Sequence, residues 1–114
     1  MINLNDSNNE GSIGTMIIRE FGTSYDTTKI QRSINLQNRM RDEHLRLCAR
    51  VKRGEFDGEG FAHRLNSLTE RYFGLIGQVV GPEDYQRIFG EPIGTPVRMA
   101  DPAIARKIDY TKNP

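Results

Sequence analysis

The chain contains a single cysteine, Cys48, and no tryptophan. One cysteine cannot form an intramolecular disulfide, so the sequence gives no indication of an oxidising compartment. No stretch approaches the roughly 20 apolar residues that a membrane-spanning helix needs. The first ten residues lack the basic region and the apolar run of a secretory signal. These absences predict a cytoplasmic protein without a membrane segment.

An excess of charge of one sign is also missing. Sixteen Lys and Arg residues oppose fifteen Asp and Glu residues among 114 residues, which gives a net charge of +1. The whole chain is therefore neither a polycation nor an acidic tail. Hydrophobic residues make up 36% of the chain without its eleven glycines, whereas the roughly 45–50% of average globular chains includes glycine. A single, small core is expected.

Periodic apolar residues predict two long helices. In residues 26–53 the apolar side chains fall within about half of the helix circumference, and Thr27 or Thr28 can cap the start. Residues 59–80 repeat apolar residues every three or four positions. Because a short glycine-rich loop joins the two, we predict an antiparallel helical hairpin in an all-α fold.

Shorter elements are expected on either side of this hairpin. Proline followed by acidic residues predicts a helix near 82–89, and Asp101-Pro102 predicts another near 102–108. Residues 13–21 are mildly apolar and fit either a short strand or a helical turn.

The predicted organisation has three parts. Residues 1–25 form a flexible or partner-ordered arm, and residues 26–90 form a helical domain. Residues 91–114 form an extended C-terminal arm with a short helix. The two arms hold 49 residues, and a hairpin with one short helix offers them little core. We therefore expect a neighbour, either a second copy or a different protein, to complete the core.

The first long helix carries arginines opposite its apolar face. Four of them recur every seven residues and form a row: Arg32, Arg39, Arg46 and Arg53. Arg50 lies beside this row. Residues 29–53 contain eight basic and two acidic residues. Three interpretations are open: a solvated face, a protein interface that pairs arginines with carboxylates, or a surface for nucleic acid or another polyanion.

Three glycines, Gly74, Gly77 and Gly81, share the side of the second long helix that is opposite its apolar stripe. Glycine within a helix costs about 1 kcal/mol relative to alanine. Their grouping predicts a face that packs closely against another backbone or a ring. The alternative is a helix that weakens toward its end, with Gly81 as terminator.

Few residues could carry chemistry. His44 and Cys48 lie four residues apart, a spacing that suits a shared metal ion or a base next to a thiol, but His63 lies on the polar side of the other helix. Arg41 falls inside the apolar arc, where it needs a carboxylate partner or a place at the edge of the core. No phosphate loop, nucleophile elbow or dinucleotide fingerprint is present. We expect no enzyme, no cofactor and no metal.

The segment from Phe56 to Phe89 resembles the Spy/CpxP-type helical proteins. In that family a long helix meets a break of the form Leu-Thr-Pro-Glu-Gln, followed by a short apolar helix. Here the corresponding residues are Val79-Val80-Gly81-Pro82-Glu83-Asp84-Tyr85, in which Pro82 and Glu83 match. The resemblance implies a curved, often dimeric hairpin of a periplasmic family, whose basic and partly apolar concave face binds clients or metals.

Two functions follow from these patterns, and a third is implied by the resemblance. The preferred hypothesis is a non-catalytic accessory subunit or adaptor that docks on a larger protein or on its own copy. The second is nucleic-acid or polyanion binding through the arginine row. The third is a chaperone of the Spy type that binds unfolded clients.

Overall fold

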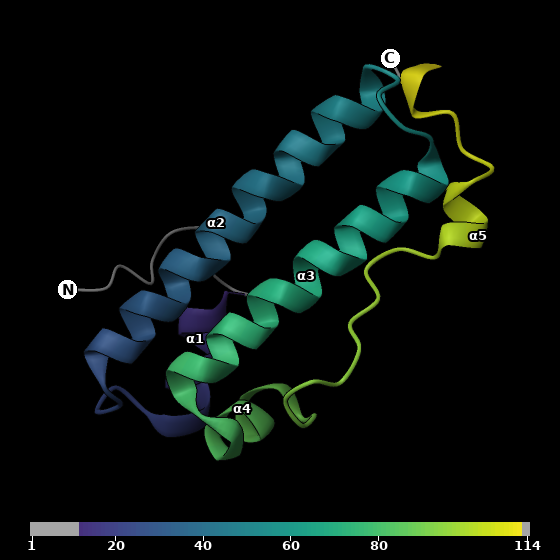
Figure 1. Cartoon of the computed structure of the whole chain (residues 1–114). Helices are drawn as coiled ribbons and strands as arrows, with labels where there is room; N and C mark the ends of the chain where they lie inside the picture. Colours follow the sequence, from purple (N-terminus) through teal and green to yellow (C-terminus); the bar gives the residue numbers. More distant parts are fainter. Residues whose placement is uncertain (1–11, 113–114) are drawn as a thin grey trace. The chain divides into compact units, whose positions relative to one another are not determined.

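The computed structural model describes residues 12–112, which form helices and no strand. The elements are α1 (Ile13–Phe21), α2 (Thr27–Lys52), α3 (Gly58–Val80), α4 (Pro82–Phe89), α5 (Pro102–Ala105) and a 3₁₀ helix, Tyr110–Lys112 (Figure 1). Helices α2 and α3 pack against each other, so the predicted all-α fold with a helical pair is confirmed. Residues 1–11 of the predicted N-terminal arm lie outside the described residues.

Local sequence signals set the ends of α2. Asp26, rather than Thr27 or Thr28, caps its start. The Oδ1 atom of Asp26 accepts hydrogen bonds from the backbone N–H groups of Thr28 and Lys29 at 2.9 and 3.3 Å. A short acidic side chain caps a helix as well as a hydroxyl does. The helix ends two residues before Gly54, whose φ of +78° favours glycine.

Backbone contacts divide the chain into two compact units. Unit 1 contains residues 12–39 and 72–95, and unit 2 contains residues 40–71 and 96–112. Each unit thus combines one stretch of α2, one stretch of α3 and one terminal segment. This division differs from the three parts expected from sequence, because each terminal segment packs on its own stretch of the long helices.

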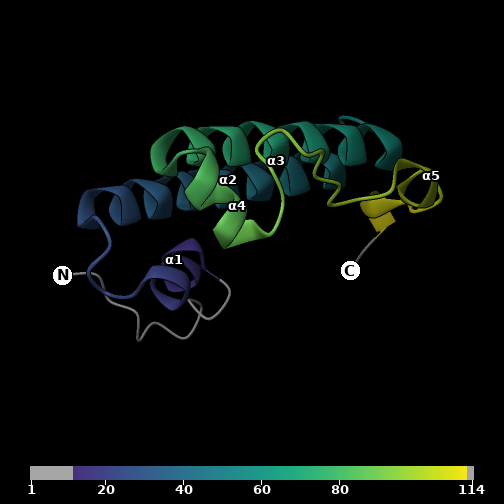
Figure 2. The ribbon, with the colours of Figure 1, turned by 90° about the horizontal axis from the view of Figure 1, so that it is seen from below.

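Unit 1 has its core between α1, α4 and the adjoining stretches of the long helices. Figure 2 shows α1 and α4 on the same side of the α2/α3 pair in this unit, and α1 contacts α4. Six buried residues form the core cluster: Ile13, Ile17, Ile30, Ile76, Val80 and Tyr85. Residues 13–21 are therefore a helix and not a strand, and they contribute two isoleucines to the core.

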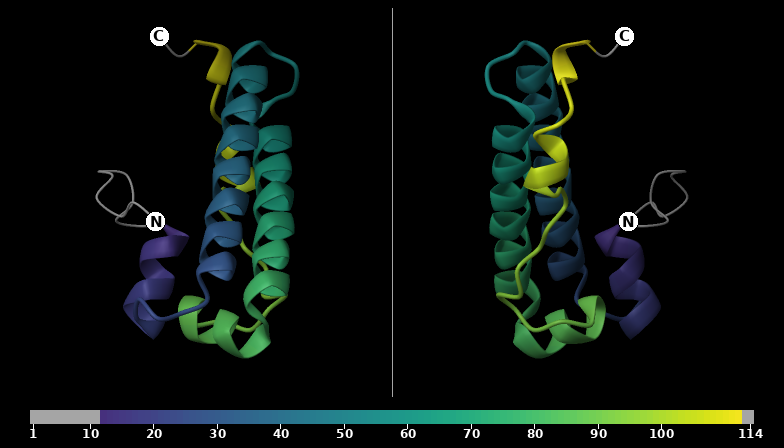
Figure 3. Two further views of the ribbon diagram at one scale, coloured as in Figure 1. Left: turned by 90° about the vertical axis from the view of Figure 1, so that its left-hand side faces the viewer. Right: turned by 90° about the vertical axis from the view of Figure 1, so that its right-hand side faces the viewer.

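In unit 2 the C-terminal segment lies along α3 (Figure 3). Ala105 is buried against Gly58, where an added Cβ would lie only 1.8 Å from the carbonyl oxygen of Ala105. The ring of Phe61 contacts that of Tyr110, with centroids 5.3 Å apart. Helix α5 ends at Ala105, so it is shorter than the expected helix near 102–108.

Both described terminal segments thus pack on helices of their own chain. For residues 12–25 and 96–112, the expectation that a neighbour completes the core is not needed to explain the burial of Ile13, Ile17 and Ala105, which pack on their own chain. Five large hydrophobic side chains of the described chain stay exposed: Leu45, Ile93, Met99, Ile104 and Ile108. Among the described helices, none combines the length and apolar character required to cross a membrane.

Candidate functional site

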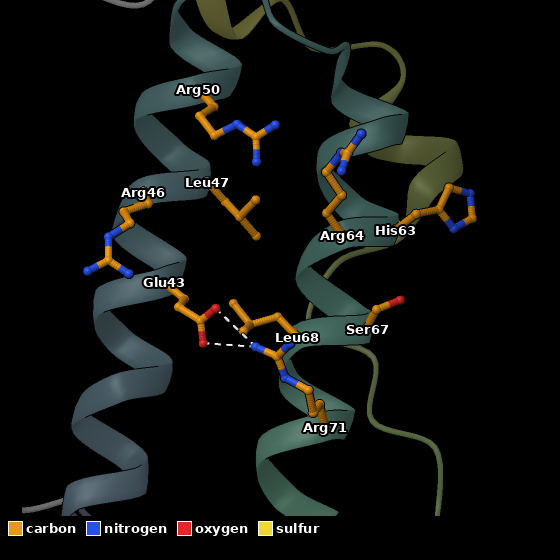
Figure 4. Close-up of a pocket in the computed structure, with 9 residues that line it drawn as sticks. All are labelled: Glu43, Arg46, Leu47, Arg50, His63, Arg64, Ser67, Leu68 and Arg71. Carbon is orange, nitrogen blue, oxygen red and sulfur yellow. Dashed lines mark hydrogen bonds and ion pairs between the residues drawn. The ribbon is translucent and has the colours of Figure 1, made fainter.

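An open groove runs between α2 and α3 in unit 2 and has a volume of about 670 Å³. Two leucines, Leu47 of α2 and Leu68 of α3, line its floor and point toward each other (Figure 4). The C-terminal segment lies behind the two helices in this view, so the groove faces away from it. Both helices expose this face because the segment covers only the other one.

Arginine dominates the rim of the groove. Four arginines line it: Arg46 and Arg50 belong to α2, and Arg64 and Arg71 belong to α3. Among the described residues, Glu43 is the only acidic one that lines the groove, and their formal charge is +3 with His63 neutral. Figure 4 shows Arg46 on the outer side of α2 and His63 on the outer side of α3.

Two of these arginines are paired with carboxylates. Nη2 of Arg71 donates to both oxygens of Glu43, at 3.0 and 2.9 Å, so this pair bridges α3 and α2. Nε of Arg50 donates to Glu55 at 3.0 Å, and Arg53 contacts the same carboxylate. These bonds hold the pKa of Glu55 below its ordinary value, first through Arg50 and then through Arg53. Exposed pairs of this kind are screened by solvent and contribute little to stability.

Phe56, in the loop between the two helices, orients two of the arginines. The guanidinium carbons of Arg50 and Arg64 lie 5.1 and 4.6 Å from the centre of its ring, within the range of cation–π attraction. Arg50 belongs to α2 and Arg64 to α3, so one ring holds cations of both helices at one end of the groove. The groove is thereby partly preorganised.

Sequence reasoning missed Phe56, Arg64 and Arg71. A signal for the two arginines was present, because they are seven residues apart on the second long helix, as the arginines of the first helix are. Phe56 stands out as an aromatic residue in a loop of glycines and acids. What was missing was the alignment of α2 with α3, which places the two rows on one groove.

The structure separates the five arginines predicted to bind a partner or polyanion. Arg46 and Arg50 line the groove. Arg53 lies outside its lining and pairs with Glu55. Arg32 and Arg39 are exposed in unit 1. Only two members of the predicted set therefore belong to the candidate site.

The three glycines predicted to form a close-packing face also differ from one another. An added Cβ at Gly77 would lie 2.9 Å from Cδ1 of Ile93, which is a close contact. At Gly74 and Gly81 it would meet nothing within 4 Å. Gly81 instead has a φ of +90°, a value that glycine adopts without strain. Close approach is thus found at Gly77, and it involves the C-terminal part of unit 1.

His44 and Cys48 are both half-buried in unit 2. The ring of His44 lies 6.5 Å from that of Phe61, centroid to centroid, in a tilted arrangement. Within residues 12–112, no group of three His, Cys, Asp or Glu side chains is placed to hold a metal ion. Arg41, which the helical pattern put inside the apolar arc, is exposed.

The resemblance of residues 56–89 to the Spy/CpxP-type proteins stays a prediction. No protein-family model, no curated protein and no solved structure matches this chain.

Proposed function

We propose that this protein is a non-catalytic helical interaction protein, an accessory subunit or adaptor, that docks on a partner protein through the groove of unit 2. One observation supports the proposal above others: four arginines line a groove whose apolar floor is formed by Leu47 and Leu68. Protein interfaces combine an apolar centre with a polar rim, and arginine is enriched in them. Preorganised arginines also lose less side-chain entropy on binding.

Exposed hydrophobic side chains add to this support. Unit 2 leaves four of them in solvent: Leu45, Met99, Ile104 and Ile108. Leu45 is 61% exposed although it belongs to the apolar arc of its helix. Hydrophobic surface that a complex covers is one use of such exposed side chains.

Nucleic-acid binding through the arginine row has less support. Sequence-independent binding to a phosphate backbone depends on many cationic contacts along one surface. Of the five predicted arginines, only Arg46 and Arg50 line the groove, and two of the five, Arg50 and Arg53, pair with Glu55. The net charge of +1 also provides little long-range attraction for a polyanion.

The test uses the full chain with a charge reversal in the groove, Arg46→Glu combined with Arg64→Glu. Its matched control, Arg32→Glu combined with Arg39→Glu, makes the same change of charge in unit 1. A partner is captured from the native host, identified by mass spectrometry, purified and titrated against all three proteins. Circular dichroism verifies that each variant is folded.

We expect a complex of defined stoichiometry, measured by light scattering and calorimetry. The groove variant should weaken it at least about tenfold, which corresponds to about 1.4 kcal/mol, and the control should bind like the wild type. A chain that forms no complex with any purified protein would disprove the proposal. So would a complex that both variants retain equally.

A further inference from the structure

We infer that the groove binds an acidic, amphipathic segment of the partner, and that Glu43 occupies the place of a ligand carboxylate until the segment arrives. The inference rests on the proposed function and adds the chemistry of the ligand and a competitor built into the site. It is carried by three features of the groove: its charge, the path of the Arg71–Glu43 pair, and its leucine floor.

The charge of the groove selects for an acidic ligand. Its lining contains four arginines and one glutamate, whereas the chain as a whole is nearly neutral. A ligand with several carboxylates can pair with these guanidinium groups through charge-assisted hydrogen bonds, which are stronger than neutral ones. A basic segment would meet like charges on both sides of the groove. Electrostatic complementarity of this kind decides which partners are rejected.

The Arg71–Glu43 pair shows how a carboxylate sits in this groove. Glu43 extends from α2 and Arg71 from α3, and their two hydrogen bonds cross the space next to Leu68 (Figure 4). A segment lying along the leucine floor has to pass this bridge. It can do so by replacing Glu43 with a carboxylate of its own, which keeps the guanidinium of Arg71 paired.

Replacement of this kind is inexpensive because the pair is open to solvent. The side chain of Arg71 is 59% exposed and that of Glu43 is 33% exposed. Neither charge has to be transferred into a dry interior when the bridge opens, so the pair contributes only a modest stabilisation. Glu43 therefore competes with the ligand without blocking it.

The leucine floor distinguishes a protein segment from a nucleic acid. Leu47 and Leu68 lie between the two rows of arginines, where an amphipathic helix can place one apolar side chain per turn while its flanking carboxylates reach the rims. A sugar–phosphate backbone also carries repeated negative charges, as such a helix does, but it has no apolar group to cover the two leucines.

The test measures fluorescence anisotropy with two labelled peptides of about 18 residues, five helical turns. The first has leucines on one stripe and glutamates on both flanks, and the second has glutamine in place of every glutamate. Each is titrated with the wild-type protein, with Glu43→Gln and with Asp42→Asn. Asp42 is the matched control, because it is exposed on the same helix, lies outside the groove lining and loses the same charge.

We expect the glutamate peptide to bind the wild type at least about tenfold more tightly than the glutamine peptide. Glu43→Gln should tighten binding of the glutamate peptide about threefold, in keeping with the strength of an exposed ion pair. Asp42→Asn should change it much less. Raising the salt from about 50 to about 200 mM should weaken the binding, because the rim is open to solvent.

Several results would overturn the inference. The first is that the glutamate peptide does not bind, or that both peptides bind equally. The second is that Glu43→Gln weakens binding of the glutamate peptide, or changes it no more than Asp42→Asn does. A single-stranded DNA of about 20 nucleotides that binds more tightly than the glutamate peptide would assign the groove to a polyanion instead. If the peptide experiment failed but binding of a purified partner still required Arg46 and Arg64, the proposed function would remain intact. Loss of that requirement would remove the function itself.

Discussion

The side-chain amide of Asn66 and the backbone of Ala100 are hydrogen-bonded to each other in both directions. Nδ2 of Asn66 donates to the carbonyl oxygen of Ala100 at 2.9 Å, and Oδ1 accepts from the N–H of Ala100 at 3.1 Å. The same oxygen accepts from the N–H of Met99 at 2.8 Å. One side chain of α3 thus satisfies three backbone groups of the extended segment that precedes α5.

Replacing Asn66 with alanine should release this segment. Three hydrogen bonds at about 0.5–1.5 kcal/mol each predict a loss of about 2 kcal/mol in the free energy of unfolding, measured by chemical denaturation. Hydrogen exchange should accelerate at the amides of residues 99–108. Ser67→Ala, at the exposed neighbouring position, is the control. Unchanged hydrogen exchange in Asn66→Ala would show that the three hydrogen bonds of Asn66 do not hold the segment in place.

Two glycines of α3 should respond to alanine with opposite signs. Gly58→Ala places a Cβ against the backbone of Ala105, where no side chain can rotate away, so we expect a loss of about 1–3 kcal/mol in stability. Gly74→Ala meets nothing within 4 Å and should gain up to about 1 kcal/mol from helix propensity. Thermal unfolding of both variants measures the contrast. Equal shifts in one direction would contradict the placement of the C-terminal segment.

The hydroxyl of Ser33 is a buried polar group without a hydrogen-bond partner in the described structure. Ser33→Ala should therefore stabilise the protein by about 1 kcal/mol, because the desolvated oxygen is removed and alanine favours a helix. Asn38→Ala, at an exposed position of α2, isolates the contribution of helix propensity. Chemical denaturation should give the larger gain for Ser33→Ala. A smaller gain than that of the control would contradict an unpartnered hydroxyl.

Tyr25 should resist ionisation in the folded protein. Its hydroxyl donates to Asp84 at 2.8 Å, and burial, followed by this bond and the charges of Asp84 and Asp26, raises the pKa of Tyr25 well above its ordinary 10.0. Burial raises the pKa of Tyr85 as well. A phenol with a raised pKa in the folded state stabilises the fold below pH 10.0 and loses this contribution as the pH rises through the raised value.

A spectrophotometric titration of the four tyrosines measures this effect. Part of the tyrosinate absorbance should develop only above the ordinary range, together with the loss of helical circular dichroism. Tyr25→Phe should remove part of this late component. If every tyrosine ionised near pH 10.0 while the helices stayed intact, the Tyr25–Asp84 bond would be contradicted.

The positions of the long helices could be predicted from sequence because the signals are local. Apolar residues every three or four positions, Gly54 after α2 and Pro82 at the start of α4 act within a few residues of where they occur. The same signals left residues 13–21 undecided. In the structure they form a helix, and Ile13 and Ile17 are buried against distant parts of the chain. A local sequence pattern cannot predict such contacts.

The candidate site was predicted only in part. The arginine row of α2 was visible, but its register against α3 was not, and that register puts Arg46 and Arg50 opposite Arg64 and Arg71. The apolar arc of α2 likewise included Leu45, which the structure leaves 61% exposed. Which part of an arc is covered depends on the elements that pack against it, and these come from remote segments.

By itself, the sequence determined the helical class, the extents of α2, α3 and α4, and the clustering of positive charge on one helix, since each depends on neighbouring residues or on helical spacing. Only the tertiary structure decided that both described terminal segments pack on their own chain and that one face between α2 and α3 stays open. Those outcomes depend on contacts between residues far apart in the chain, such as Asn66 with Ala100. Their geometry follows from how side chains of different elements fit together.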